Sequence, residues 1–263
     1  MKPEIRSYLN RIGYPTEPGI EPRCDFSTLS QLQSRHLQTV PYENLDIMRD
    51  IPLSLEIDDM YEKIVVRGRG GYCFELNGLF AWLLREMGFG VVEYMARYLR
   101  DEPEIPMRRH RVLKVTCGET AYLCDVGVGA IIPREPIPIV TGQVIEQNFA
   151  GTERYKLEKE HFLGYVLYEW KKDSWQKVYS FTEEEQLNID YVMPSFYCEK
   201  HPESFFRTMD MVHIFTDNGR KSVSTGEYGR ELKIFSTKGV EVIVPATDTI
   251  YHELLQVHFG ITI

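Results

Sequence analysis

The sequence lacks the cysteine and histidine spacings that hold structural metals or build disulfide frameworks. Its five cysteines are an odd number, and they are scattered without a Cys-x-x-Cys pair. We therefore expect reduced thiols and no bound metal. Because most buried cysteines act as small apolar side chains, a special role for any one of them has to come from its surroundings.

Long apolar runs and basic stretches are also missing. No uninterrupted apolar segment approaches the roughly 18–20 residues that cross a bilayer, and residues 1–13 lack the apolar core of a secretory signal. The net charge is −9, with no Lys/Arg block beyond short pairs, whereas nucleic-acid binding normally needs a basic stripe. We expect a cytoplasmic protein, monomeric or homodimeric, that binds neither membranes nor nucleic acid.

The order of the apolar patterns predicts three structural parts within the 263 residues. Four helices are expected in the first part. The first is closed by Gly13, and the second is capped by Ser27 or Thr28. The third is capped by Ser54, and the fourth runs from Cys73 to Gly88.

After Gly90 the pattern changes to strands, at 91–98, 109–116 and 121–126, with further hairpins over 153–181 around Asp173-Ser174. A hairpin at Asn218-Gly219, two more strands and a helix from Thr247 follow. The predicted units are a helical bundle over 1–90, a β-barrel or sheet over 91–181, a connecting segment over 182–206 and a smaller α/β unit over 207–263.

The most informative motif is the glycine-rich turn of residues 67–72, which places Cys73 at the start of an apolar helix. A helix N-terminus flanked by arginines stabilises a thiolate, and Arg69 lies close in sequence. A histidine, His110, and a carboxylate, Asp125, follow downstream. These three groups can perform nucleophilic catalysis when a histidine moves the proton and a carboxylate orients it. They suggest covalent acyl transfer through a thioester.

The spacing of His110 and Asp125 can be tested by strand geometry. If Gly118-Glu119 is a two-residue hairpin turn, paired residues sum to 237 and Val112 lies opposite Asp125. His110 is then diagonal to Asp125 on the same face, roughly 7–8 Å away, within reach of both side chains. Only tertiary packing can bring Cys73 to this pair. Taken singly, each residue is more often structural than catalytic, and the glycines around 68–71 and 127–129 match no standard phosphate loop.

Five motifs in this order resemble the arylamine N-acetyltransferase family. They cover nearly the whole chain and are Tyr-Leu-Asn-Arg-Ile-Gly-Tyr at 8–14, Val-Pro-Tyr-Glu-Asn-Leu at 40–45, Arg-Gly-Gly-Tyr-Cys-Phe-Glu-Leu-Asn at 69–77, His-Arg-Val-Leu at 110–113 and Asp-Val-Gly-Val-Gly at 125–129. The resemblance implies an α+β, three-part, cysteine-protease-like fold with an N-terminal helical bundle, a central β-barrel and a C-terminal α/β lid.

The resemblance also implies a chemistry. It implies a Cys73-His110-Asp125 triad, acetyl-CoA as donor, a ping-pong route, and aromatic amines or hydrazines as acceptors. We expect Cys73 to attack the acetyl group, and its pKa to be lowered by the helix N-terminus, by the Arg69 side and by protonated His110. Backbone N–H groups, including that of Cys73, are expected to hold the oxyanion.

Further family positions receive provisional roles from the same motifs. They are Tyr42 and Val128 in the acceptor pocket, Gly127 and Gly129 in CoA binding, and Arg11, Glu43 and Arg69 in a buried ion network that braces the helical part. Many relatives have an aromatic residue where this chain has Val128. Its loss removes a stacking partner worth roughly 0.5–1.5 kcal/mol and widens the pocket.

Two alternative functions remain open, one that uses the same triad and one that does not use it. A cysteine hydrolase or transglutaminase-like amidase has the same triad but lets water discharge the acyl-enzyme. A CoA-binding or scaffold protein would leave the triad without a function. The behaviour of an acyl-enzyme in the absence of an amine distinguishes these alternatives.

Overall fold

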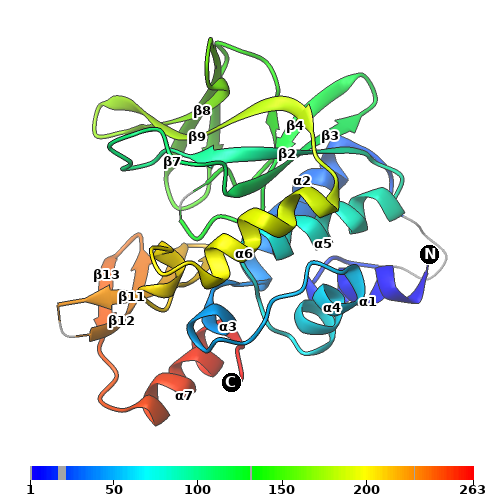
Figure 1. Cartoon of the computed structure of the whole chain (residues 1–263). Helices are drawn as coiled ribbons and strands as arrows, with labels where there is room; N and C mark the ends of the chain where they lie inside the picture. Colours follow the sequence, from blue (N-terminus) through cyan, green and yellow to red (C-terminus); the bar gives the residue numbers. More distant parts are fainter. Residues whose placement is uncertain (1, 17–21, 131, 228) are drawn as a thin grey trace.

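The protein, described here as a computed structural model over residues 2–16, 22–130, 132–227 and 229–263, has helices at its N-terminal end followed by two antiparallel sheets (Figure 1). This is a mixed α+β fold, as predicted. The α-helices are α1 (Pro3–Arg11), α2 (Phe26–Thr39), α3 (Leu45–Met48), α4 (Ile57–Tyr61), α5 (Cys73–Glu86), α6 (Val192–Lys200) and α7 (Asp248–Phe259).

The larger sheet is a nearly closed barrel with the strand order β5-β4-β3-β2-β9-β8-β7-β6. Its strands are β2 (Gly90–Tyr98), β3 (His110–Cys117), β4 (Thr120–Cys124), β5 (Ile137–Pro138), β6 (Val144–Asn148), β7 (Thr152–Glu160), β8 (Gly164–Lys171) and β9 (Ser174–Glu185). The smaller sheet has the order β1-β10-β11-β12-β13, and its strands are β1 (Tyr42–Glu43), β10 (Val212–Thr216), β11 (Gly219–Gly226), β12 (Gly229–Ser236) and β13 (Gly239–Ile243).

The predicted ends of α1 and α5 agree with the structure, but the predicted starts of α2 and α4 do not. Gly13 and Gly88 have positive φ angles of 63° and 89°, which fits their predicted places after α1 and α5. The predicted N-caps of α2 and α4 are wrong. Asp25 caps α2 by accepting from the Thr28 N–H at 2.9 Å, because a carboxylate at this position meets the free N–H groups of the first turn. Glu56, rather than Ser54, precedes α4.

Two hairpin turns lie one residue earlier than predicted. The ladders pair Lys171 with Ser174 and Thr216 with Gly219, so the turn residues are 172–173 and 217–218. Lys172 and Asp173 both have positive φ angles, 51° and 58°, which is the backbone that a two-residue turn between twisted strands requires. The composition of a turn therefore indicated its position to within one residue.

Strand β1 was not predicted and connects distant parts of the chain. Tyr42 pairs with His213 and Glu43 with Val212, so the N-terminal segment supplies an edge strand to the C-terminal sheet. Tyr42 also bridges to Gly71, directly before α5. The barrel strand β9 runs to Glu185, past residue 181. The division of the chain at residues 90, 181 and 206 stays a prediction.

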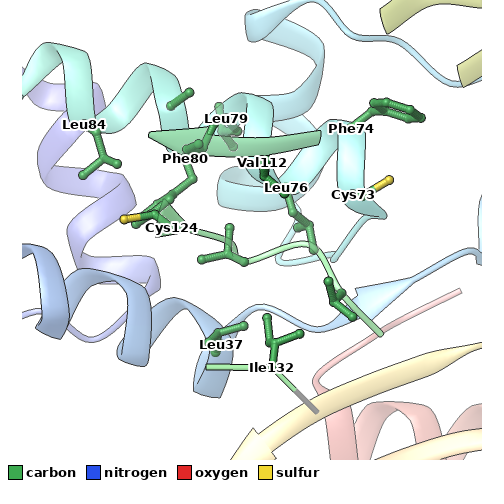
Figure 2. Packing of buried hydrophobic residues seen from close by; sticks show 14 of the residues in the cluster. Leu37, Cys73, Phe74, Leu76, Leu79, Phe80, Leu84, Val112, Cys124 and Ile132 are labelled. Atoms are coloured by element: carbon green, nitrogen blue, oxygen red, sulfur yellow. The ribbon is translucent and has the colours of Figure 1, made fainter. Parts of the chain in front are cut away.

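Two apolar cores hold these parts together. The larger one is shared by helices α1, α2 and α5 and the barrel, and Figure 2 shows part of it, from Leu84 to Cys73 along α5. The smaller one lies between the C-terminal sheet and α7, and includes Val212, Val223 and Leu255. None of the helices in the described ranges is long and apolar enough to cross a bilayer.

The helical core contains a histidine that carries no charge. His36 is fully buried between Tyr8 and Phe80, and neither ring nitrogen has a hydrogen-bond partner. Burial, together with the Arg11 guanidinium, lowers the pKa of His36 from 6.5 to about 3. The unfolded chain therefore binds a proton near pH 6.5 that the folded protein does not bind until about pH 3.

This difference predicts an acid-sensitive stability. Lowering the pH from 7 to 5 should reduce the free energy of unfolding by about 2 kcal/mol through His36 alone. A His36→Leu variant should lose this part of the pH slope, whatever its stability at pH 7, while His252→Gln on the exposed side of α7 should keep it. Urea unfolding at several pH values measures the slope. Equal slopes for wild type and His36→Leu would contradict the prediction.

Candidate active site

The start of helix α5 is fixed by close backbone packing and by one carboxylate. A Cβ on Gly70 would lie 1.9 Å from the Pro41 carbonyl oxygen, so only glycine fits there. The Tyr72 N–H donates to Oε2 of Glu75, the third helical residue, at 3.1 Å. This bond satisfies one of the N–H groups that a helix start leaves free, and it makes Cys73 the first residue of the helix.

A chain of buried charges extends from this carboxylate. Lys63 Nζ lies 2.8 Å from Glu75 Oε1 and 2.7 Å from Asp46 Oδ2. Arg69 contacts Asp46 at 2.8 Å and Glu43 at 2.7 Å. Although burial opposes it, the neighbouring carboxylates of Glu75, Glu43 and Asp46 raise the pKa of Lys63, which stays charged. The predicted Glu43–Arg69 contact is therefore present, within a larger network whose other members the sequence did not indicate.

Arg11 is not part of this ion network, contrary to the prediction. Its guanidinium donates to the carbonyl oxygens of Thr39 at 2.7 Å, Ile64 at 3.1 Å and Gly68 at 3.1 Å. The carbonyl of Thr39 lies at the end of α2, and those of Ile64 and Gly68 lie in the π-helical segment Glu62–Val66 and the turn after it. Helix ends leave carbonyl groups free, and a guanidinium has five N–H donors to satisfy them. Arg11 thus stabilises backbone carbonyl groups rather than the buried carboxylates of the ion network.

Strand register brings His110 to Asp125. The ladder pairs Leu113 with Cys124 and Cys117 with Thr120, so the predicted sum of 237 is correct. His110 Nε2 lies 2.7 Å from Asp125 Oδ2, and both side chains are buried. The ring of Tyr179 packs beside the imidazole at a centroid distance of 5.4 Å. With Nε2 occupied by the carboxylate, Nδ1 is the nitrogen that remains to exchange a proton.

Asn77 joins the three elements that carry these groups, and no role for it was predicted from the sequence. Its side-chain Nδ2 donates to the Arg111 carbonyl at 2.6 Å and to Asp125 Oδ1 at 2.8 Å. Its Oδ1 accepts from the Val126 N–H at 2.9 Å. The available signal was its spacing: Asn77 is a polar residue one helical turn after Cys73 in a mostly apolar helix.

Cys73 lies beside the start of β3. Its Sγ donates to the carbonyl oxygen of Arg109 at 3.7 Å, directly before His110, and the residue is 2% exposed. Burial raises the pKa of the Cys73 thiol well above its usual value, with the nearby Cys198 and Asp125 adding to the effect, while the backbone N–H groups of Arg111 and Phe74 oppose it.

The expectation of a lowered Cys73 pKa is therefore wrong for the resting protein. Arg69 contributes little because its guanidinium is paired with two carboxylates. The N–H groups at the helix start do favour the thiolate, but removal of water outweighs them. A buried thiol of this kind needs a base beside it before it can act as a nucleophile.

Cys73 and His110 open onto one cavity of about 530 Å³. The predicted residues Tyr42, Gly127, Val128 and Gly129 all line it. The sequence did not indicate the rest of the wall, which includes Tyr98, Arg100, Asp101, Glu102, Arg109, Ala130, Phe205, Phe206 and Met211.

Close packing leaves no room for a side chain at Gly127 or Gly129. A Cβ on Gly127 would lie 2.7 Å from the Cys73 Cα, and one on Gly129 would lie 2.5 Å from the Tyr42 ring. The Gly127 N–H donates to Asp125 Oδ1 at 2.8 Å, so it is already used. A contact of either glycine with CoA stays a prediction.

Comparison with known proteins agrees with this geometry. Residues 25–263 match the family model described as N-acetyltransferase. The arylamine N-acetyltransferase of Mycobacterium tuberculosis is 34% identical over 268 residues, covering 99% of this chain and 90% of the relative. The chain belongs to the arylamine N-acetyltransferase family. It is therefore an acyltransferase.

Solved structures of family members have the same fold. The Mycobacterium marinum enzyme in complex with CoA superposes with a TM-score of 0.85 at 32% identity, over 98% of this chain and 92% of that one. A Bacillus cereus arylamine N-acetyltransferase, described as having a Cys-His-Glu catalytic triad, has a TM-score of 0.88 at 26% identity over the full length of both chains. In this chain the acid that contacts the histidine His110 is Asp125.

Because Gly127 packs closely against Cys73, adding a single methyl group at residue 127 should have a severe effect. Gly127→Ala should destabilise the protein by about 1–3 kcal/mol, because the new Cβ meets the Cys73 backbone and the Asn77 amide. It should also slow labelling of Cys73 by iodoacetamide. Gly90→Ala is the matched control, since its Cβ would be 3.5 Å from Thr116, an ordinary contact. Thermal unfolding and labelling rates test this, and a Gly127→Ala protein with wild-type values for both would contradict it.

Proposed function

We propose that the protein transfers an acetyl group from acetyl-CoA to aromatic amines or hydrazines by a ping-pong mechanism, through a thioester on Cys73. The observation that carries this proposal is that the Cys73 thiol and the His110 imidazole face one cavity, while Asp125 holds the imidazole from the opposite side at 2.7 Å. The names of the relatives support the acceptor class, and the CoA complex of the M. marinum enzyme supports the donor.

In the first half-reaction, His110 takes the proton of Cys73 as the sulfur attacks the acetyl carbonyl. The carboxylate of Asp125 balances the positive charge that the imidazole gains. Backbone N–H groups at the start of α5, including that of Cys73, stabilise the oxyanion. CoA then leaves as a thiol, with the proton that His110 holds. One thioester replaces another, so this step needs little driving force.

In the second half-reaction, the amine attacks the acetyl-cysteine and loses a proton to His110. The Cys73 thiolate leaves and recovers that proton. The burial that raises the pKa of the thiol also limits the directions from which water can reach the thioester, because Cys73 is only 2% exposed and meets solvent through the cavity. This favours an amine that fills the cavity over water as the acyl acceptor.

The walls of the cavity suit an aromatic acceptor. Tyr42, Phe205 and Phe206 supply aromatic surface within the volume of about 530 Å³. Val128, at 5% exposure, supplies no ring at the position where the family resemblance leads us to expect an aromatic residue in many relatives. In this chain the stacking surface for the acceptor therefore comes from the phenylalanines after α6 and from β1, on the other walls of the cavity.

Acetylation of Cys73 in the absence of amine is the first test. Intact-protein mass spectrometry after mixing with acetyl-CoA should show a gain of one acetyl group, peptide mapping should locate it on Cys73, and an aromatic amine or hydrazine should discharge it. Release of CoA without an adduct would instead indicate the hydrolase alternative. Absence of both adduct and CoA release would contradict acetyl-CoA as donor.

Two variants test the roles of Cys73 and Asp125 in this reaction. Cys73→Ser should form no adduct, and Asp125→Asn should form it at least tenfold more slowly, since an amide cannot balance the imidazolium charge. Cys117→Ser, at a half-buried thiol outside the cavity, should react like the wild type.

Acceptor choice should depend on residue 128. Val128→Phe should raise the KM for bulky aromatic amines by about tenfold or more, because the larger ring fills part of the cavity, and should leave the rate of acetyl-cysteine formation within about threefold of wild type. Steady-state kinetics with small and bulky anilines, together with stopped-flow acetylation, separates the two effects. Equal KM changes for small and bulky amines would contradict a role in acceptor selection.

A further inference from the structure

Two of the five thiols are accessible. Cys24 is exposed and Cys117 is partly exposed, whereas Cys73, Cys124 and Cys198 are buried. All five are free thiols in the structure. Although Cys24 and Cys117 are distant in sequence, two independent contacts bring Cys24 to the end of the β3–β4 hairpin that carries Cys117.

The first contact runs through the start of β2. Gly90, the first residue of β2, pairs with Thr116, the residue directly before Cys117. Cys24 Sγ donates to the carbonyl oxygen of Gly88, the residue before Phe89, at 3.5 Å. Cys24 therefore lies against the backbone two residues before Gly90, whose cross-strand partner precedes Cys117.

The second contact runs through β4. The Phe26 ring stacks on Tyr122 at a centroid distance of 4.8 Å. Tyr122 pairs with Val115, and Cys117 pairs with Thr120, so Tyr122 and Cys117 are diagonal neighbours on one face of the sheet. Because Phe26 is two residues after Cys24, this stacking brings Cys24 to the same end of the β3–β4 hairpin.

The electrostatics of the thiols agree with their proximity. Burial raises the pKa of Cys117 to about 11, and the negative charges that Cys24 and Asp25 can carry add to this. Burial and the neighbouring Asp25 also raise the pKa of Cys24. Both thiols are therefore mostly protonated at neutral pH, and thiol exchange at this site becomes faster at alkaline pH.

We propose that Cys24 and Cys117 form a dithiol modification site that a small disulfide, such as oxidised glutathione, converts into a protein disulfide. The thiolate of one cysteine attacks the small disulfide, forming a mixed disulfide and releasing one thiol. The thiolate of the other cysteine then attacks the protein sulfur of the mixed disulfide and releases the second thiol. Two protein thiols are oxidised and one small disulfide is reduced to two thiols, so electrons and protons balance.

This bond would connect the segment before α2 to the barrel. It would close a loop of roughly 90 residues, which restricts the unfolded chain strongly. The nucleophile would be unaffected, because Cys73 begins α5 and Gly88 follows its end, about 21 Å away along a 14-residue helix. Oxidation of this pair should therefore change stability and leave the Cys73 chemistry as it is.

The test is oxidation of the full-length protein with oxidised glutathione at about pH 8.5, followed by alkylation of remaining thiols and non-reducing peptide mapping. The expected result is a linked peptide pair containing Cys24 and Cys117, with a rise in Tm of about 5 °C that dithiothreitol reverses. Iodoacetamide labelling of Cys73 should stay within about twofold of the reduced protein.

Matched variants separate the pair from other thiols. Cys24→Ser and Cys117→Ser should each lose both the linked peptide and the Tm rise, whereas Cys198→Ser should keep them. Three outcomes would overturn the proposal. They are separate glutathione adducts on Cys24 and Cys117, alkylation of both thiols, and linkage of either cysteine to a different one. A 24–117 link without a rise in Tm would overturn the stabilising connection.

Discussion

The geometry of the site depends on one buried amide, the side chain of Asn77. Its three hydrogen bonds connect helix α5, which carries Cys73, to strand β3 behind His110 and to the turn that carries Asp125. Nucleophile and imidazole come from different parts of the chain, so no local sequence element determines their separation. A fully satisfied buried amide has only one arrangement that leaves no polar atom unpaired, and this rigidity positions both groups.

Prediction from sequence succeeded where short-range chemistry decides the structure. The Gly118-Glu119 turn determines the β3–β4 register, and the register alone brings His110 to Asp125. It failed where the determining partner is distant. Strand β1 has two residues and pairs with a strand about 170 positions later, so neither its length nor its composition distinguishes it from a loop. The carbonyl groups that hold Arg11 depend on a π-helical segment that no apolar pattern indicates.

Burial of the nucleophile has two opposing effects. It raises the pKa of Cys73, which makes the thiol less reactive at rest and makes a base such as His110 necessary. In the proposed mechanism it also limits the access of water to an acyl group on the sulfur, which is the condition that separates a transferase from a hydrolase. An exposed, low-pKa thiolate would react faster with acyl donors and also with water. Under the proposed mechanism, burial of Cys73 thus favours selectivity of the acyl-enzyme over intrinsic reactivity of the free thiol.

The charge network couples the nucleophile to the wall of its own cavity. Glu75 holds the start of α5, Lys63 and Asp46 connect it to Arg69, and Arg69 contacts Glu43. Glu43 lies in β1 next to Tyr42, which lines the cavity. Buried ion pairs contribute little net stability, since desolvation offsets their attraction, but removal of one partner leaves an uncompensated charge. Their value here is therefore geometric: any displacement of β1 that moves Tyr42 also separates Glu43 from Arg69, so cavity shape and thiol position are held as one unit.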